Sequence, residues 1–190
     1  MRWEKGVTMI LERLSRVTAA MATPGETAEV LAFAVQVLAP QKTRPLQPEG
    51  KERDLYHLID WYLSERNGIA LARDKETGAL AGMMAVQAFD APYHIEHIAN
   101  VFDFATYYGY TAETAAVYRR TLIAEAYPRP QTLRAMVKVA DAFARTQGYR
   151  YVYRHCHFND LPVMLLWRRV GYDVTEENYD TGSVHMQKTL

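Results

Sequence analysis

The sequence predicts a single α/β domain in which helical and strand patterns follow one another along most of the chain. Its 190 residues are enough for one domain with a buried core and too few for two ordinary domains. Hydrophobic residues make up 49% and charged residues 23%, which is typical of soluble globular proteins and excludes a disordered or fibrous chain. We therefore expect an N-terminal segment, residues 1–20, followed by one domain, residues 21–190.

The first half of the domain is expected to contain two helices and a hairpin. The segment Thr23-Pro24-Gly25-Glu26 is typical of a capping box, so a helix is predicted to follow it up to about Leu38. A polar connector leads to a second predicted helix, about 52–66, whose apolar residues recur at helical spacing. The next expected element is a hairpin, with strands at 69–73 and 79–88 around the acidic turn 74–78.

The second half begins with a segment that is harder to assign, residues 89–130. A strand is predicted at 93–104 and a helix rich in Ala, Glu and Arg at 111–126, before the break Pro128-Arg129-Pro130. A helix at 131–147 has one apolar stripe and ends at Gly148; its opposite, polar face is predicted to contain Arg134, Lys138, Asp141 and Arg145. The remainder predicts a strand at 149–158, a short helix at 161–170 and a closing hairpin at 172–188.

Charge and cysteine content narrow the classes of partner. Lys plus Arg and Asp plus Glu both count 22, so the formal net charge is zero, and we expect no nucleic acid partner. The sequence contains no apolar run long enough to predict a membrane span, so no membrane partner is expected. Cys156 is the single cysteine, which favours a cytoplasmic protein over a secreted one. The near-neutral surface is compatible with a homo-oligomer or a larger assembly.

A metal site is not expected at the segment His155-Cys156-His157. The two histidines would share one face of a strand, but no third ligand is evident, and Cys156 would point to the opposite face. Cys156 is accordingly predicted to be a small buried thiol rather than a nucleophile.

Two stretches of the chain resemble the GNAT acyltransferase family. Residues 144–148 resemble the end of that family's A-x-x-x-G helix, and a strand, Asn159 and the segment Leu165-Leu166-Trp167-Arg168-Arg169-Val170-Gly171-Tyr172 follow in the family's order. The hairpin at 70–86 is similar to the family's acidic turn and Val-Gly-like strand. The resemblance implies a mixed central sheet flanked by helices, with one splayed pair of parallel strands that holds acetyl-CoA or another acyl-CoA.

The family's pyrophosphate loop reads Arg or Gln, two residues, Gly, one residue, Gly, and two registers are open here. In the register that we prefer, Val101 ends the strand at 93–104, and the cofactor loop comprises Tyr108, Gly109, Tyr110 and Thr111. In the other register the strand lies near 117–126, and the loop is 129–134, with two cations and no glycine. The resemblance also implies that Asn159 helps to hold the pantetheine arm.

The resemblance implies candidate catalytic positions as well. In the register that we prefer, Glu96 matches the family's strand carboxylate and would accept a proton from an amine; the alternative is that Glu96 is an exposed strand carboxylate without a catalytic role. Trp167 stands where the family commonly has a Tyr that protonates the departing thiolate, and an indole N–H cannot transfer a proton at neutral pH. Two hypotheses follow: an acyl-CoA-dependent transferase acting on a small-molecule or protein amine, or an inactive structural protein such as a phage virion component.

Overall fold

The computed structural model describes residues 16–38, 59, 62–63, 66–89, 111, 113–178 and 182–190. The elements begin with β1 (Val17–Met21), a short 3-10 helix (Pro24–Glu26), α2 (Thr27–Leu38), β2 (Gly68–Asp74) and β3 (Leu80–Ala88). After residues outside the description come β4 (Ala115–Ile123), α5 (Arg129–Thr146), β5 (Tyr151–His157), a second 3-10 helix (Phe158–Asp160), α6 (Leu161–Arg168), β6 (Asp173–Asn178) and β7 (Ser183–Thr189).

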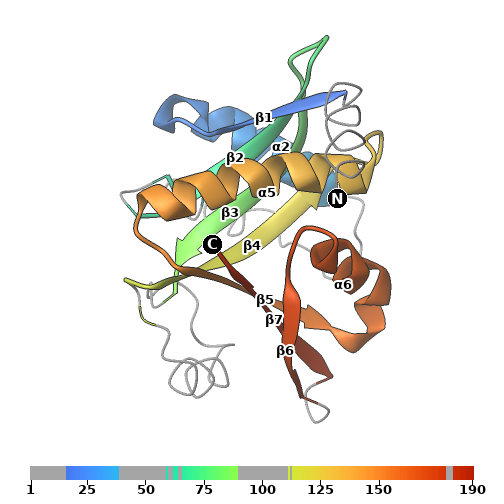
Figure 1. The fold of residues 1–190 in the computed structure, drawn as a ribbon. Coiled ribbons are helices and arrows are strands. Elements are labelled where there is room, and N and C mark those ends of the chain that lie inside the picture. Colours follow the sequence, from blue (N-terminus) through green and yellow to red (C-terminus); the bar gives the residue numbers. More distant parts are fainter. Residues whose placement is uncertain are drawn as a thin grey trace, which may run out of the picture.

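The strands form one mixed sheet of seven strands in the order β1-β2-β3-β4-β5-β7-β6. Every neighbouring pair is antiparallel except β4 and β5, which are parallel. Helix α5 crosses one face of this sheet, and α2 lies behind the opposite face (Figure 1). The predicted α/β class with helices flanking a mixed sheet is confirmed.

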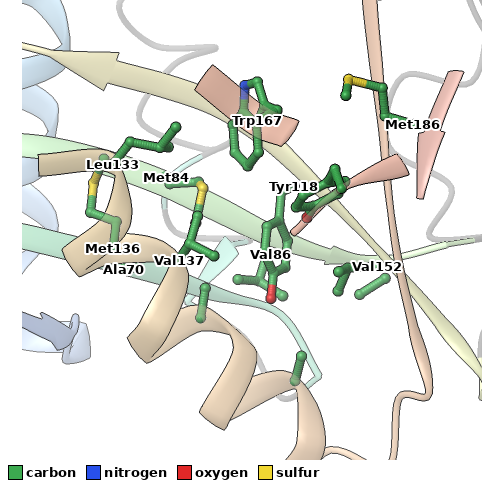
Figure 2. Close-up of a cluster of buried hydrophobic side chains, with 14 of the residues drawn as sticks. Ala70, Met84, Val86, Tyr118, Leu133, Met136, Val137, Val152, Trp167 and Met186 are labelled. Atoms are coloured by element: carbon green, nitrogen blue, oxygen red, sulfur yellow. The ribbon is translucent and has the colours of Figure 1, made fainter. Parts of the chain in front are cut away.

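Each face of the sheet has its own core. The α5-side core packs strand residues against α5 and α6; Figure 2 labels Ala70, Met84, Val86, Tyr118, Leu133, Met136, Val137, Val152, Trp167 and Met186. The α2-side core comprises Val30, Phe33, Ala34, Ile59, Tyr62, Ile69, Leu71, Met83 and Ala85. Membership of one of these two cores therefore shows on which face of the sheet the side chain of a strand residue lies.

Local sequence signals explain several of these elements. The carboxylate of Glu26 accepts hydrogen bonds from the amide of Thr23 at 2.7 Å and from its hydroxyl at 2.9 Å, at the predicted start of the first helix. Asp74 ends β2, and its Oδ1 accepts bonds from the amides of Glu76 and Thr77, while Gly78 adopts a φ of 73°. These contacts form the predicted turn between β2 and β3.

Three expectations for the elements need correction. The helix predicted at 111–126 is strand β4, and pairing with β3 and β5 overrides the helix propensity of its Ala and Arg residues. Strand β1 begins at Val17 and pairs with β2, so the sheet extends into the expected N-terminal segment, residues 1–20. Asp141 is 5% exposed rather than on a solvated helix face. The strand predicted at 93–104 lies outside the described residues.

Within the described part of the chain, no helix is long and apolar enough to cross a bilayer.

Candidate acyl-CoA site

The central feature of the sheet is the divergence of β4 from β5, which we call the splay. The two strands pair through only three residue pairs, of which the last joins Val117 to Tyr153. Beyond that point β4 continues along β3 as far as Ile123, whereas β5 continues along β7 (Figure 1). The edge of β4 from residue 118 onward therefore has no strand pairing on the β5 side among the described residues.

A β-bulge lies in β4 just beyond the last pair with β5. Met83 pairs with Leu122 and Ala85 pairs with Arg119, so one extra residue is inserted in β4 opposite β3. Arg120 lies in this bulge with a φ of 50°, and it is the one non-glycine residue with a positive φ in the described part of the chain. A side chain in this backbone region costs free energy, and such strain concentrates at functional sites.

The open end of the splay faces the beginning of helix α5. Strands β4 and β5 are paired at their starts and diverge toward their ends, and α5 begins six residues after the end of β4, at Arg129. The first bond at this helix start runs from the Thr132 amide to the Pro128 carbonyl at 3.1 Å, so the amides of Arg129 and Gln131 precede the helical ladder. The first turn has no acidic residue. Its dipole and unpaired donors favour an anion.

The order of elements favours the second of the two registers for the pyrophosphate loop. The strand that leads into a helix start at the splay is β4, at 115–123, and the segment after it contains Arg129 and Arg134 without any glycine. Both arginines are exposed. The structure thus places two exposed arginines in the first two turns of α5.

An arginine of β5 extends across the splay on its α5 side. Arg154 Nη1 donates to the Tyr118 carbonyl at 3.4 Å and to Thr121 Oγ1 at 3.2 Å, both on β4. Its guanidinium carbon lies 4.1 Å from the centroid of the Trp167 indole ring, and its buried Nε has no hydrogen-bond partner. Arg154 therefore occupies the edge of β4 that would otherwise face the gap.

Trp167 is 1% exposed and packs in the α5-side core rather than lining an open surface. Its ring meets that of Tyr172 edge to face, with centroids 5.1 Å apart. Figure 2 shows Trp167 and Tyr118 pointing into the same cluster between the sheet and the helices. The indole ring of Trp167 therefore packs within the apolar core, and Arg154 stacks on it.

A buried ionic cluster joins the two sides of the splay, and we call it the Asp141 cluster (Asp141, Tyr118 and Lys188). The carboxylate of Asp141, on α5, accepts a hydrogen bond from Tyr118 Oη at 2.8 Å and from Lys188 Nζ at 2.5 Å. Lys188, on β7, also donates to the Val170 carbonyl at 2.9 Å. Burial has the largest effect on the pKa of Tyr118 and raises it well above its ordinary value, and nearby Tyr172 and Asp141 raise it further. The Tyr118 hydroxyl therefore stays protonated and remains a donor.

The opposite mouth of the splay, on the α2 side, is lined by hydrogen-bond donors. Tyr118 points to the α5 side, so by strand alternation Arg119 points to the α2 side. Tyr62 Oη donates to Gln87 Oε1 at 3.4 Å on this face, and Tyr153 Oη pairs with His185 Nδ1. Burial lowers the pKa of Arg119, an effect that nearby Tyr62 and Tyr153 oppose.

The residues predicted for the site fall in three different places. Glu96, Val101, Tyr108, Gly109 and Tyr110 lie outside the described residues. Thr111 is exposed; its amide donates to Thr114 Oγ1 at 2.9 Å, immediately before β4 and at the closed end of the splay. Asn159 is exposed just after the end of β5, at the open end. The structure thus separates Thr111 from the start of α5 and places Asn159 at the open end of the splay.

Sequence reasoning missed Arg154, the bulge at Arg120 and the Asp141 cluster. A charged residue among the aromatic residues of a predicted strand was a signal for Arg154, because a charge on a buried strand requires partners. No group of three or more His, Cys, Asp or Glu residues that could hold a metal ion is present in the described residues. Cys156 is buried in the α5-side core, as predicted.

Solved structures share this fold over most of the chain. A candidate acetyltransferase from Salmonella typhimurium, solved with its cofactor acetyl-CoA, superposes with a TM-score of 0.65 at 12% identity, covering 93% of this chain and 95% of that chain. The chain has the GNAT fold. A GNAT-family acetyltransferase from Streptococcus pneumoniae gives a TM-score of 0.63 at 13% identity, covering 92% and 99%.

An aminoglycoside 6'-acetyltransferase of type Ii also shares the GNAT fold, with a TM-score of 0.59 at 11% identity, covering 90% of this chain and 96% of that chain. No protein-family model matches the sequence. No curated protein matches it either. The predicted resemblance is confirmed at the level of the fold.

Proposed function

We propose that this chain is an acyl-CoA-dependent N-acyltransferase that passes an acetyl or similar group to an amine. The observation that supports this most is the splay, because among the described residues the β5-side edge of β4 has no strand partner beyond Val117, and this edge opens toward the start of α5. An extended pantetheine arm pairs with such an edge in the way that an added strand does. Ligands of α/β sheets bind at the carboxyl ends of the strands, which is where this gap opens.

The chain offers groups for each part of acyl-CoA. The β4 edge beyond Tyr118 would pair with the pantetheine amides, and Asn159 would bind the arm from the end of β5. The pyrophosphate would lie at the first turn of α5, where Arg129 and Arg134 supply charge in place of glycines. A guanidinium binds phosphate through two parallel hydrogen bonds, so side chains replace part of what a backbone cradle supplies.

The reaction would proceed by direct attack in a ternary complex. The amine nitrogen forms a bond to the thioester carbonyl carbon, the carbon–sulfur bond breaks, and CoA leaves as a thiolate. Glu96, which matches the family's strand carboxylate in the sequence, is the proposed base for the amine proton. Trp167 cannot protonate the thiolate, so the fold would contribute mainly orientation, which is worth several kcal/mol.

A second candidate function is an inactive GNAT-fold structural or interaction protein, such as a virion component. The specific observation in its favour is that Arg154 bonds to the β4 edge and packs on Trp167, which together occupy part of the splay. A chain that never admits a pantetheine arm would benefit from this packing. Fold alone does not decide between the two functions.

A thermal-shift titration with acetyl-CoA and CoA tests the proposed transferase. A ligand that binds only the folded state raises the melting temperature with its concentration, and we expect a saturable rise at micromolar acetyl-CoA. Arg129→Gln and Arg134→Gln are expected to weaken binding of both ligands by about tenfold each, because each removes a charged contact. Equal melting temperatures with and without millimolar ligand would overturn the proposal and favour the inactive candidate.

A further inference from the structure

The α2-side mouth of the splay presents two adjacent arginines on one strand. Arg119 is the second residue beyond the last β4–β5 pair, and Arg120 is the extra residue of the bulge. Arg119 pairs in register with Ala85, a residue of the α2-side core, so its side chain lies on that face next to Tyr62. The bulge thus places two guanidinium groups beside the gap on the face opposite α5.

The backbone at Arg120 is in a conformation that costs free energy. Arg120 adopts a φ of 50°, a region that a glycine or asparagine would occupy with less strain. Arg119 is partly buried, and no carboxylate within the described ranges forms an ion pair with either arginine. A partly buried cation with no carboxylate partner among the described residues costs free energy, and such groups are typical of ligand sites.

The surrounding groups suit an anion. Burial raises the pKa of the Tyr62 hydroxyl, and the charges of Arg119 and Arg120, together with a hydrogen bond to the Arg120 side chain, oppose that rise. The pKa of Arg119 is lowered chiefly by burial, and a bound anion would reverse that cost. The exposed side chain of His155 is on the same face of the neighbouring strand, its ring centroid 5.6 Å from that of the buried His185.

We propose that Arg119 and Arg120 bind an acid group of the acyl acceptor, so that the acceptor is an amine carrying a carboxylate or a phosphate. This inference rests on the proposed function, because it assigns the two mouths of the splay to different substrates. Acyl-CoA approaches on the α5 side, where its phosphates meet the helix start. The acceptor approaches on the α2 side, and two guanidiniums there disfavour polycationic amines such as aminoglycosides.

The test is thermal-shift titration of the full chain with matched acceptors, each with and without CoA. Each α-amino acid is paired with its amide, which keeps the amine and removes the carboxylate, and phosphoethanolamine is paired with ethanolamine. We expect at least one acid-bearing amine to raise the melting temperature while its neutral partner does not. A response to an amino acid indicates a site for a carboxylate, and a response to phosphoethanolamine indicates a site for a phosphate.

Variants locate the binding. Arg119→Gln and Arg120→Gln are each expected to weaken binding of the responding acid amine by about tenfold or more. The control is Arg150→Gln, at an exposed arginine immediately before β5, which should leave binding unchanged. Arg120→Gly serves as a second variant, since glycine suits the backbone there and keeps the chain folded while the cation is lost.

The outcomes separate this inference from the transferase. Three results would each overturn the proposed anion site. They are equal binding of neutral and acid-bearing amines, no binding of any acid-bearing amine, and unchanged binding in Arg119→Gln and Arg120→Gln. Arginine-dependent binding of an acid amine without any shift by acetyl-CoA would retain the anion site and refute the transferase. A shift by acetyl-CoA without binding of any acid-bearing amine would retain the transferase and refute the anion site.

Discussion

Asp141→Ala is expected to lower the free energy of unfolding by about 3 to 5 kcal/mol, the range for breaking a buried ion pair from one side. The substitution leaves Lys188, with an 18% exposed side chain, without its carboxylate, and it leaves the buried Tyr118 hydroxyl without an acceptor. Urea denaturation followed by circular dichroism measures the change. Asp173→Ala, at an exposed carboxylate that begins β6, is the matched control and should cost less than about 0.5 kcal/mol.

A double variant tests whether the charges themselves are responsible. In Asp141→Leu with Lys188→Met both charges are absent, so the penalty of an unpaired buried cation disappears, and the double variant should be more stable than Asp141→Ala. A loss below about 1 kcal/mol in Asp141→Ala would show that the cluster does not hold the two sides of the splay together.

Arg154→Met is expected to tighten acetyl-CoA binding by about tenfold. Arg154 now donates to the Tyr118 carbonyl and to Thr121 on the β4 edge, and an incoming pantetheine arm must displace it. A hydrogen bond to a charged group contributes about 1.5 to 3 kcal/mol, and removing a contribution at the lower end of this range from the free state favours the ligand by about tenfold. Methionine retains an apolar contact with Trp167.

Isothermal titration calorimetry of wild type, Arg154→Met and Arg168→Met measures this effect, where Arg168 is an exposed residue of α6 far from the β4 edge in sequence. Tighter binding in Arg154→Met alone supports competition for the edge. Weaker binding in that variant would mean that Arg154 contacts acyl-CoA directly, and the proposed competition would be wrong.

The parts of the fold that could be predicted are those with local signals. The hairpin of β2 and β3 depends on Asp74 and Gly78 within one turn, and α5 ends just before Gly148, whose φ of 86° favours glycine. The apolar stripe of α5 and the order of elements after it also follow from spacing within a few residues. These signals were sufficient for the fold and for placing Asn159 and Trp167 after β5.

The site could be predicted less well because its determinants are distant in sequence. The bulge at Arg120 shifts the alternation of β4 by one residue, so the strand lacks a continuous period of two and its Ala and Arg residues suggest a helix. Asp141 looks like a surface residue of α5 because its partner Lys188 follows 47 residues later. Likewise, Arg154 meets the β4 edge only after the sheet has formed.

Hydrogen exchange of the backbone amides, measured with and without saturating acetyl-CoA, tests the central claim most directly. If the pantetheine arm adds to the splay, amides in residues 118–123 of β4 and at the start of α5 should exchange more slowly, while those of β1 and β2 stay unchanged. Unchanged exchange along β4 in the presence of bound acetyl-CoA, or protection confined to another part of the chain, would contradict the assignment of the splay as the acyl-CoA site.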